Sequence, residues 1–547
     1  MADMNTPTDI NPNDTRGEAL LNLHIHDRFV SELPADPDLD NHRRQVLGAC
    51  YSFVKPTPVT APYLIAYSPE VAADIGLSPH DCESLEFTNV FVGNALIDGM
   101  QPHAMCYGGH QFGNWAGQLG DGRAINLGEV EDRHGELQML QLKGAGETPY
   151  SRSADGLAVL RSSVREFLCS EAMFHLGVPT TRALSLVGTG EDVIRDMFYD
   201  GRPKAEPGAV VCRVAPSFLR IGNYELFASR GELDNLRHLI NYTIRHHFAH
   251  LGEPSTETYL KWFKEISERT AKLVVHWMRV GFVHGVLNTD NTSILGLTID
   301  YGPYGWIDNY DPDWTPNTTD AGGKRYRFGH QAQIAQWNLL QLGNALYPLI
   351  EDAEPLRQVL NDFVDFYNQH WQQMRADKLG LKQFIEETDQ PLNQELQKIL
   401  MLTETDMTIF YRRLADVPCE PDTAINDTEL LSIFDEAFYA PESLSKADKD
   451  DIVAWLKHYQ TRVQQDGTKD KDRKAAMNQV NPKFILRNYL AQQAIDKAEA
   501  GDFSEVIKLL EIMRHPYDEQ PEYDEYAGKR PDWARQKPGC SMLSCSS

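Results

Sequence analysis

The stretch His284-Gly-Val-Leu-Asn-Thr-Asp-Asn291, followed by Asp300-Tyr-Gly302, decides how this 547-residue chain folds. Asn291 brings an amide oxygen and Asp300 a carboxylate, and a short apolar run separates the two motifs. Oxygen atoms delivered from two neighbouring loops suit a Mg²⁺ ion that bridges nucleotide phosphates. Either motif alone is typical of an ordinary Asx-rich turn beside a strand. Together, in this order, they predict that Asn291 and Asp300 bind Mg²⁺, or Mn²⁺ in its place, with ATP as the substrate.

The interval from His284 to Asn291 is that of the catalytic loop of protein kinases, H-R-D-L-x-x-x-N, and Asp300-Tyr-Gly302 stands where kinases have D-F-G. The position of the kinase base, two residues after the histidine, holds Val286. Valine can neither accept nor orient a hydroxyl proton, so any base catalysis has to move to Asp290, the nearest carboxylate in the sequence. The pattern therefore predicts a kinase-like cleft with a different catalytic geometry, which is compatible with a kinase reaction that uses Asp290 or with a different reaction.

Other parts of such a cleft precede this stretch in the expected order. The loop GQLGDGR carries Gly120, Gly122 and the cation Arg123, and its glycines let the backbone approach phosphates closely. Lys143 ends a predicted strand about one hairpin later, and Glu166 lies in the helix predicted to follow. We expect Lys143 to contact phosphates and Glu166 to pair with it, as strand lysine and helix glutamate do in kinases.

The pattern of apolar residues divides the chain into a mixed N-terminal region and a helical C-terminal region. Short apolar runs predict strands at 123–130, 137–144, 183–188 and 209–215, with one helix at 155–177 and helical periodicity from about 231 onward. We predict an α+β fold, protein-kinase-like and two-lobed, with an N-terminal extension and a helical C-terminal extension. The expected segments are a flexible tail at 1–20, the N-terminal extension at 21–100, an N-lobe at 101–230 with the glycine-rich loop and the Lys/Glu pair, a C-lobe core at 231–345 with both motifs, a helical region at 346–518 and a flexible tail at 519–547.

The composition limits the possible partners. The formal net charge of −27 opposes binding to nucleic acid and to anionic membranes, so local basic residues must meet any phosphate. No run of 18 apolar residues occurs, and the N-terminus lacks the pattern of a signal or transit peptide. We expect a cytoplasmic protein, a monomer, with neither a membrane nor a nucleic-acid partner.

Eight cysteines are scattered along the chain, which is typical of a protein in a reducing cytosol rather than of a disulfide framework. Cys540 and Cys545 stand apart because they lie in the Ser-rich ending GCSMLSCSS. A mobile tail would expose both thiols to solvent, where they could form a redox-active pair or could be two idle cysteines.

Longer strings extend these observations. YGGHQFGNWAGQLGDGRA, QLKGAGETPYSRSADGLAVLRSSVREFLCSEAM, HGVLNTDN, DYGP and the CSS terminus resemble the selenoprotein O family, protein adenylyltransferases with a pseudokinase fold, from about residue 25 to the C-terminus. The resemblance implies that ATP lies inverted relative to kinases, so that AMP passes to Ser, Thr or Tyr hydroxyls of client proteins and pyrophosphate leaves. It implies Asp290 as the base, Asn291 and Asp300 as Mg²⁺ ligands, and nucleotide contacts at Gly120, Gly122, Arg123, Lys143, Asp155, Gly156, Arg213, Arg220 and Asp300.

The resemblance also bears on Val286 and on the tail. If the γ-phosphate no longer points at the client hydroxyl, the reaction does not need a base at position 286. Cys545 matches the place that holds selenocysteine in some family members, and some bacterial relatives pair the tail cysteine with one in the loop after D-Y-G, which gives redox control. Here that loop, residues 300–323, contains no cysteine, so Cys545 is left to act with Cys540 or with another protein.

Three functions stay open at this point. AMP transfer predicts that the α-phosphate of ATP becomes bound to protein and the γ-phosphate does not. An atypical kinase with Asp290 as base would transfer the γ-phosphate. A non-catalytic pseudokinase scaffold would transfer neither, yet Mg²⁺-ATP would stabilise its fold, and Asp300→Ala would abolish that stabilisation.

Overall fold

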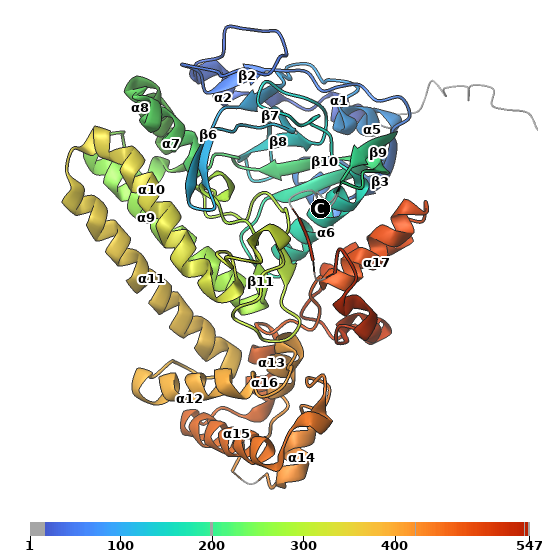
Figure 1. The fold of residues 1–547 in the computed structure, drawn as a ribbon, viewed down its shortest axis with the longest axis vertical. Coiled ribbons are helices and arrows are strands. Elements are labelled where there is room, and N and C mark those ends of the chain that lie inside the picture. The colour runs from blue at the N-terminus through green and yellow to red at the C-terminus, as the bar shows by residue number, and fades with distance from the viewer. Residues whose placement is uncertain (1–16, 197–200, 422, 541, 545–547) are drawn as a thin grey trace, which may run out of the picture.

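The computed structural model describes residues 17–196, 201–421, 423–540 and 542–544. It has a sheet-rich lobe, formed by the N-terminal part of the chain, and a helical lobe that continues into a long helical extension (Figure 1). The predicted α+β, two-lobed fold is therefore confirmed. Of the predicted N-terminal tail, residues 1–16 lie outside the described residues, and Leu20, in the short helix α1 (Glu18–Leu21), is fully buried.

One antiparallel sheet forms the N-lobe, in the order β2-β4-β7-β8-β10-β9-β3, with β1 paired to β7. The predicted hairpin is β7 and β8, in which Ala124 lies opposite Lys143. The chain between β4 and β7 forms a separate hairpin, β5 and β6. The strands are β1 (Ile25–His26), β2 (Tyr51–Phe53), β3 (Tyr63–Tyr67), β4 (His103–Met105), β5 (Gly108–Gln111), β6 (Asn114–Gln118), β7 (Ala124–Glu131), β8 (Leu137–Lys143), β9 (Arg182–Arg195) and β10 (Lys204–Ala215).

The two-residue period of a strand decides what each face of this sheet meets. On β8, Leu140 and Leu142 enter one core cluster, which also contains the helix α5 (Leu85–Val92). Met139 points the other way, into the cluster around the helix α6 (Leu160–His175). Gln141 and Lys143 share that second face by alternation, which directs the lysine toward α6 and the space between the lobes.

The C-lobe is built from long amphipathic helices, as the periodicity predicted. The helices of this lobe are α7 (Ile221–Arg230), α8 (Leu233–His247), α9 (Thr256–Val280), α10 (Gln331–Ile350) and α11 (Ala353–Leu379), and a short pair of strands, β11 (Phe282–Val283) and β12 (Gly305–Trp306), flanks the two motifs. The extension adds α12 (Glu386–Ile399), α13 (Met407–Leu414), α14 (Asp427–Ser432), α15 (Lys446–Asp466) and α16 (Asp470–Asn478). It ends with α17 (Asn488–Glu499) and α18 (Ser504–Met513), which return to pack on α6.

Three features differ from the prediction. The segment 21–100 is no separate extension, since β1, β2 and β3 join the N-lobe sheet and α2 (Arg28–Glu32), α3 (Pro69–Asp74), α4 (Pro79–Cys82) and α5 pack beside it. Strands β9 and β10 continue past their apolar residues into the segment predicted to be a polar loop. Lys204 pairs with Arg195 there, beyond a bulge near Pro207. Residues 197–200 of that loop lie outside the described residues.

The flexible tail predicted at 519–547 is the third difference. Its described part contains two short 3-10 helices, η6 (Pro521–Ala527) and η7 (Asp532–Arg535), in which Tyr526 and Ala534 are buried. Leu543 is 1% exposed, and its backbone bonds to Pro316 and Thr318. These few apolar side chains hold an otherwise polar segment against the core, which its composition does not reveal.

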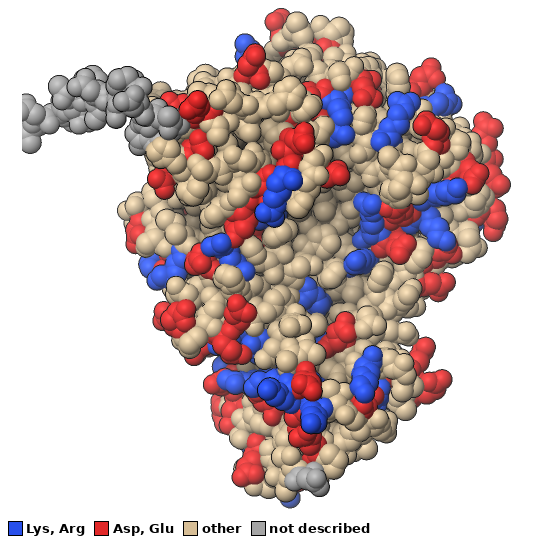
Figure 2. Space-filling model, turned by 180° about the vertical axis from the view of Figure 1, so that it is seen from behind, with Lys and Arg blue, Asp and Glu red and all other residues tan. Residues whose placement is uncertain are grey.

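Among the described residues, none of the helices combines the length and the apolar composition needed to cross a membrane. Acidic and basic side chains are mixed over the face of the molecule seen in Figure 2 rather than gathered into a single basic area.

Candidate functional site

Lys143 and Glu166 form the first part of the site. The Nζ of Lys143 lies 2.5 Å from a carboxylate oxygen of Glu166, which α6 presents beneath the sheet. Burial lowers the pKa of Lys143 to about 8, against the opposing effect of Glu166. Because α17 and α18 pack on α6, the helical extension holds the glutamate in this position.

Asp300, the first residue of the DYG motif, is surrounded by cations. Arg213 donates to Oδ1 at 2.7 Å, Arg220 bonds Oδ2, and the Nζ of Lys143 lies 4.0 Å away. Burial works against ionisation, but the attraction of Arg220, then of Arg213 and Lys143, holds the pKa of Asp300 well below its usual range. The backbone φ of 57° at Asp300 is uncommon for a non-glycine residue and marks a strained, closely held position.

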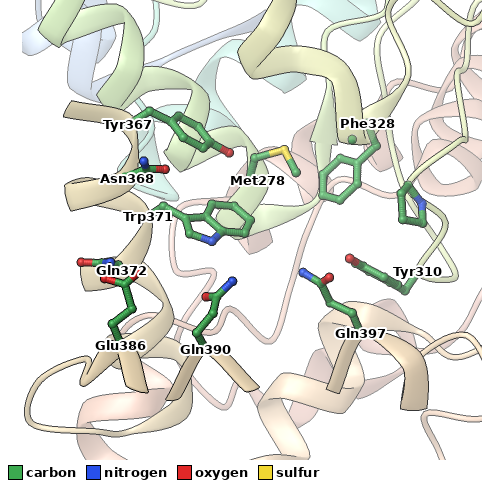
Figure 3. A pocket seen from close by; sticks show the side chains of 12 residues that line it. Met278, Tyr310, Phe328, Tyr367, Asn368, Trp371, Gln372, Glu386, Gln390 and Gln397 are labelled. Atoms are coloured by element: carbon green, nitrogen blue, oxygen red, sulfur yellow. Dashed lines mark hydrogen bonds between the residues drawn. The ribbon is translucent and has the colours of Figure 1, made fainter. Parts of the chain in front are cut away.

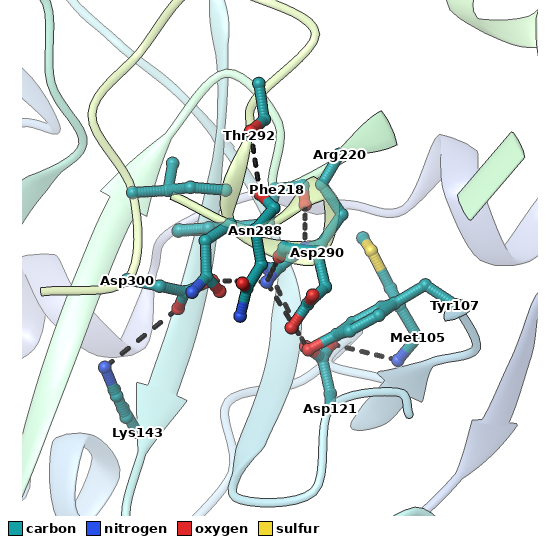
Figure 4. A network of polar contacts seen from close by, with 12 residues as sticks. Met105, Tyr107, Asp121, Lys143, Phe218, Arg220, Asn288, Asp290, Thr292 and Asp300 are labelled. Atoms are coloured by element: carbon teal, nitrogen blue, oxygen red, sulfur yellow. Dashed lines mark hydrogen bonds and ion pairs between the residues drawn. The ribbon is translucent and has the colours of Figure 1, made fainter. Parts of the chain in front are cut away.

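The two arginines reach this carboxylate from different elements. Arg213 lies opposite Gln141 in the pairing of β10 with β8, so alternation puts it on the same sheet face as Lys143. Arg220 precedes α7, and its guanidinium also donates to the backbone oxygen of Asp290 at 3.0 Å and stacks over the ring of Tyr107 at 4.4 Å. Arg220 therefore links the DYG motif to the loop that carries Asp290, as Figure 4 shows.

The HGVLNTDN loop brings Asn291 and Val286 to the cleft. His284 is buried, and its ring lies 3.1 Å from the backbone oxygen of Ile299, which fixes the loop against the segment before the DYG motif. The amide nitrogen of Asn291 donates to the backbone oxygen of Val286 at 2.9 Å, so its Oδ1 is turned the other way. Val286 lines the cleft and offers no group that could accept a proton.

Asp290 lies at the edge of the cleft under the β5–β6 hairpin. The side chain of Gln111 donates to Oδ2 at 3.1 Å, whereas Oδ1 is buried without a hydrogen-bond partner among the described residues. Burial raises the pKa of Asp290 to about 7, and the bond from Gln111 opposes this in part. A carboxyl group that titrates near neutrality, with one oxygen still unsatisfied, has the properties of a general base or acid.

A cavity of about 730 Å³ joins these groups, and it is large enough for a nucleotide. Gly120 and Gly122 leave room for Tyr150, whose ring would lie 2.4 Å from a Cβ at position 120. Gly156 has φ +72°, and a Cβ there would lie 2.1 Å from the backbone oxygen of Gly146. The predicted site residues that line this cavity are Gly120, Gly122, Arg123, Lys143, Asp155, Gly156, Arg213, Asp290, Asn291 and Asp300.

Comparisons with known proteins show the family of the chain. The family model described as protein adenylyltransferase SelO matches residues 39–514. The chain belongs to the SelO family. A curated relative from Aromatoleum aromaticum, named protein nucleotidyltransferase YdiU, is 60% identical, and the match covers 96% of this chain and 100% of the relative. A relative of the same name from Rhodopirellula baltica is 58% identical, and the match covers 96% of this chain and 99% of the relative. The relative from Flavobacterium johnsoniae, with the same name, is 54% identical over 96% of this chain and 100% of its own length.

A solved structure is also similar to this SelO family chain. It is ROP2 from Toxoplasma gondii, a virulence factor with a protein-kinase fold and no enzymatic activity. The match covers 55% of this chain and 87% of that chain, with 12% sequence identity and a TM-score of 0.21. A TM-score and an identity this low support no conclusion about the site. The kinase-like arrangement described above rests on the geometry of this chain.

Two predicted residues of this SelO family site have partners that the sequence did not suggest. Asp155 lines the cavity, but its carboxylate is held by Arg195 at 2.7 Å through both oxygens. Arg220 is not part of the cavity lining and acts through Asp300 and the Asp290 backbone.

The sequence reasoning missed several groups that hold the site together. Gln111 bonds Asp290, and Asp121 lies buried 3.9 Å from Arg220. Gly109 packs so closely on Asp290 that a Cβ there would lie 2.5 Å from Oδ1. The pair Gly108-Gly109 indicates a place where another group can approach the backbone closely, but nothing in the sequence indicates which group it is.

Of the two tail thiols predicted to be exposed, Cys540 differs from the prediction. Cys540 is 2% exposed, and burial raises the pKa of its thiol to about 11, so it is poorly reactive. Cys545 lies outside the described residues. The backbone of Leu543 bonds to Pro316 and Thr318, and Asn317 between them donates to Gly285 of the catalytic loop at 3.1 Å.

A second cavity, of about 570 Å³, lies between α11 and α12 (Figure 3). Tyr367 and Trp371 stack along α11 with ring centroids 5.7 Å apart, and Gln390 and Gln397 face them from α12. It contains none of the predicted site residues, and amides and aromatic rings rather than paired acids and bases line it. The acidic and basic groups suited to group transfer therefore line the larger cavity.

Proposed function

We propose that this chain is a protein adenylyltransferase, which transfers AMP from ATP to hydroxyl groups of client proteins and releases pyrophosphate. Membership of the SelO family and relatives named protein nucleotidyltransferase support nucleotidyl transfer. The observation that carries the proposal is the distribution of charge in the cleft. Lys143 and Asp290 lie on opposite sides of Asp300 in the view of Figure 4, so a lysine marks one end of the cleft and the candidate base the other, with Arg220 bridging Asp300 and the backbone of Asp290.

The cationic end suits the part of ATP that carries most charge. Its positive side chains outnumber its carboxylates, which leaves a positive excess for an anionic Mg²⁺-ATP complex. The cations are Arg123, Lys143 and Arg213, and the carboxylates are Glu166 and Asp300. With the β- and γ-phosphates at this end, the α-phosphate faces Asp290, and the same cations stabilise the pyrophosphate as it leaves.

The reaction then needs one proton acceptor. The client hydroxyl oxygen forms a bond to the α-phosphorus, the bond from that phosphorus to the bridging oxygen of the β-phosphate breaks, and the hydroxyl proton passes to Asp290. A pKa of about 7 matches a base that works near neutral pH. Val286, at the kinase base position, is not required in this geometry.

Asn291 and Asp300 fit a Mg²⁺ ion that also takes oxygen ligands from phosphates. The Oδ1 of Asn291 is turned away from the hydrogen bond that its nitrogen makes, and each carboxylate oxygen of Asp300 can accept a metal besides an arginine. Mg²⁺ usually binds to one or two protein groups and the substrate phosphates, so no larger cluster is needed. When bound, the ion would neutralise phosphate charge; Mn²⁺ would serve the same role.

The proposal extends to the partners. The clients are modified on Ser, Thr or Tyr, and the protein acts as a cytoplasmic monomer without nucleic acid. The net charge of −27 and the mixed surface of Figure 2 support the last point. A part in redox control stays a prediction, because Cys545 lies outside the described residues and Cys540 is buried.

The released product tests the proposal. With Mg²⁺-ATP and a protein acceptor such as casein, we expect pyrophosphate and no ADP. Asp290→Asn should lower the rate ~10²–10⁴-fold, the usual contribution of a positioned base. Asp234→Asn, which changes an exposed carboxylate on α8, should leave the rate unchanged. Release of ADP would support an atypical kinase, and stabilisation by Mg²⁺-ATP without either product would support a scaffold.

A further inference from the structure

Two tryptophans and an arginine gather beside the cleft without a role in the chemistry above. Trp115, on β6, is 39% exposed, and its ring centroid lies 5.1 Å from that of His110. The same histidine meets Trp337 of α10 edge-on at 5.4 Å. The guanidinium of Arg325 lies over the Trp337 ring at 4.7 Å. We call Trp115, Arg325 and Trp337 the Trp-Arg lip.

Trp115 of the lip lies on the β5–β6 hairpin, which also contacts the loop of the candidate base. The backbone N–H of His110 donates to Thr289 at 2.7 Å, and the side chain of Gln111 donates to Asp290 at 3.1 Å. Gly113, at the turn of this hairpin, lies against Arg325, since a Cβ there would be 3.5 Å from the guanidinium carbon. A group bound at the lip would therefore lie within a few residues of the hydroxyl that Asp290 activates.

Arg325 has no carboxylate within ion-pair distance in the part of the chain that the structure describes, although the protein carries a net charge of −27. Its neighbour Arg327 pairs with Asp313 at 3.0 Å. The nearby carboxylate of Asp320 accepts backbone N–H groups of residues 325 and 326 instead. The Nε of Arg325 is buried without a hydrogen-bond partner among the described residues. The guanidinium is thus held in place by ring stacking and not by an acidic partner.

A planar guanidinium held over an aromatic ring suits a carboxylate, which it can bind through two parallel hydrogen bonds. An exposed tryptophan beside it adds apolar contact with low cost in conformational entropy. We propose that the Trp-Arg lip recognises an acidic side chain of the client protein next to the hydroxyl that is modified. The inference rests on the proposed AMP transfer, and it adds the class of client sequence that the enzyme selects.

Peptide binding tests the lip separately from the reaction. The full-length chain, with Mg²⁺ and α,β-methylene ATP, is titrated into two fluorescein-labelled peptides that share one tyrosine, flanked by glutamates in one and by lysines in the other. Anisotropy at low ionic strength should show tighter binding of the glutamate peptide by about tenfold or more. Arg325→Glu should abolish or reverse this preference, and Arg327→Glu, two residues along the same segment, should keep it. Trp115→Ala should weaken the binding of both peptides.

Each other outcome overturns the proposal or separates it from the proposed function. Equal binding of the two peptides, or an unchanged preference in Arg325→Glu, would overturn it. A changed affinity for the ATP analogue in Arg325→Glu or Trp115→Ala, with peptide binding unaffected, would show that the lip holds the nucleotide base and not the client. If the preference is found but ATP itself gives no AMP-peptide, the lip stands as a client site and the proposed reaction fails.

Discussion

Gly109→Ala displaces the candidate base without removing it. An added methyl group would lie 2.5 Å from Oδ1, 2.8 Å from Cβ and 2.9 Å from Cγ of Asp290. Tight but real contacts begin at about 3.0 Å and ordinary ones at 3.4 Å, so the two groups must separate by about 0.9 Å (3.4 minus 2.5). Gly109 is not among the glycines with a positive φ, so the substitution introduces no left-handed backbone strain.

A shift of ~1 Å in a reacting group costs ~10²-fold in rate, which equals ~2.7 kcal/mol. We expect kcat for AMP transfer from α-³²P-labelled ATP to fall by about this factor. The KM for ATP should change less than about twofold, because the three atoms nearest to the added methyl group all belong to Asp290. Gly322→Ala is the matched control, since a Cβ there meets nothing within 4 Å. A Gly109→Ala enzyme with wild-type kcat would refute the assignment of Asp290 as a closely positioned base.

Other predictions concern the lysine pair, the N-terminal segment and the tail. Glu166→Gln removes the carboxylate 2.5 Å from Lys143, and initial rates should show a rise of about tenfold in KM for ATP; an unchanged KM would mean that the pair does not position the lysine. Burial raises the pKa of Asp27 from 3.8 to about 7, so the folded state binds this proton more tightly than the unfolded state and the wild type loses stability as the pH rises from about 4 through 7. The Asp27→Asn variant lacks that loss, so in thermal melts the difference between its Tm and the wild-type Tm should increase between about pH 5 and pH 8. A Tm difference that does not change with pH would contradict the raised pKa of Asp27. Leu543→Ala, at a 1% exposed site, should lower the free energy of unfolding by ~2–5 kcal/mol in urea titrations, whereas Met542→Ala, at a 41% exposed site, should change it by less than ~0.5 kcal/mol. Equal effects of these two changes would show that the tail does not pack as described.

The sequence predicted the parts of the site that follow one another in a fixed order. His284, Asn291 and Asp300 were found by spacing, and Lys143 and Glu166 by their places in a strand and in the next helix. The two-residue period of β8 then suffices to turn Lys143 toward the cleft, so no contact from distant sequence is needed to place it. These residues come together because local periodicity and the order of elements agree.

The parts that escaped prediction depend on contacts between distant segments. Gln111 meets Asp290 across 179 positions, and neither residue type signals the other. The strands β1, β2 and β3 are two to five residues long, too short for a period of two to show. The tail is polar in composition, but single buried side chains such as Leu543 and Cys540 decide its order. The Gln111–Asp290 contact, the short strands and the order of the tail each depend on residues that are distant in sequence and close in space. A single sequence does not show which residues these are.

The hypothesis that the cleft transfers AMP is tested most directly by measuring which phosphate of ATP becomes bound to protein. The full-length chain is incubated with Mg²⁺ and a protein acceptor, with ATP labelled by ³²P at the α-position in one sample and at the γ-position in the other. We expect protein-bound label from the α-position, none from the γ-position, and loss of the α-signal in Asp290→Asn. Protein-bound label from the γ-position would contradict it, because the cations around Asp300 would then hold ATP in the orientation of a kinase.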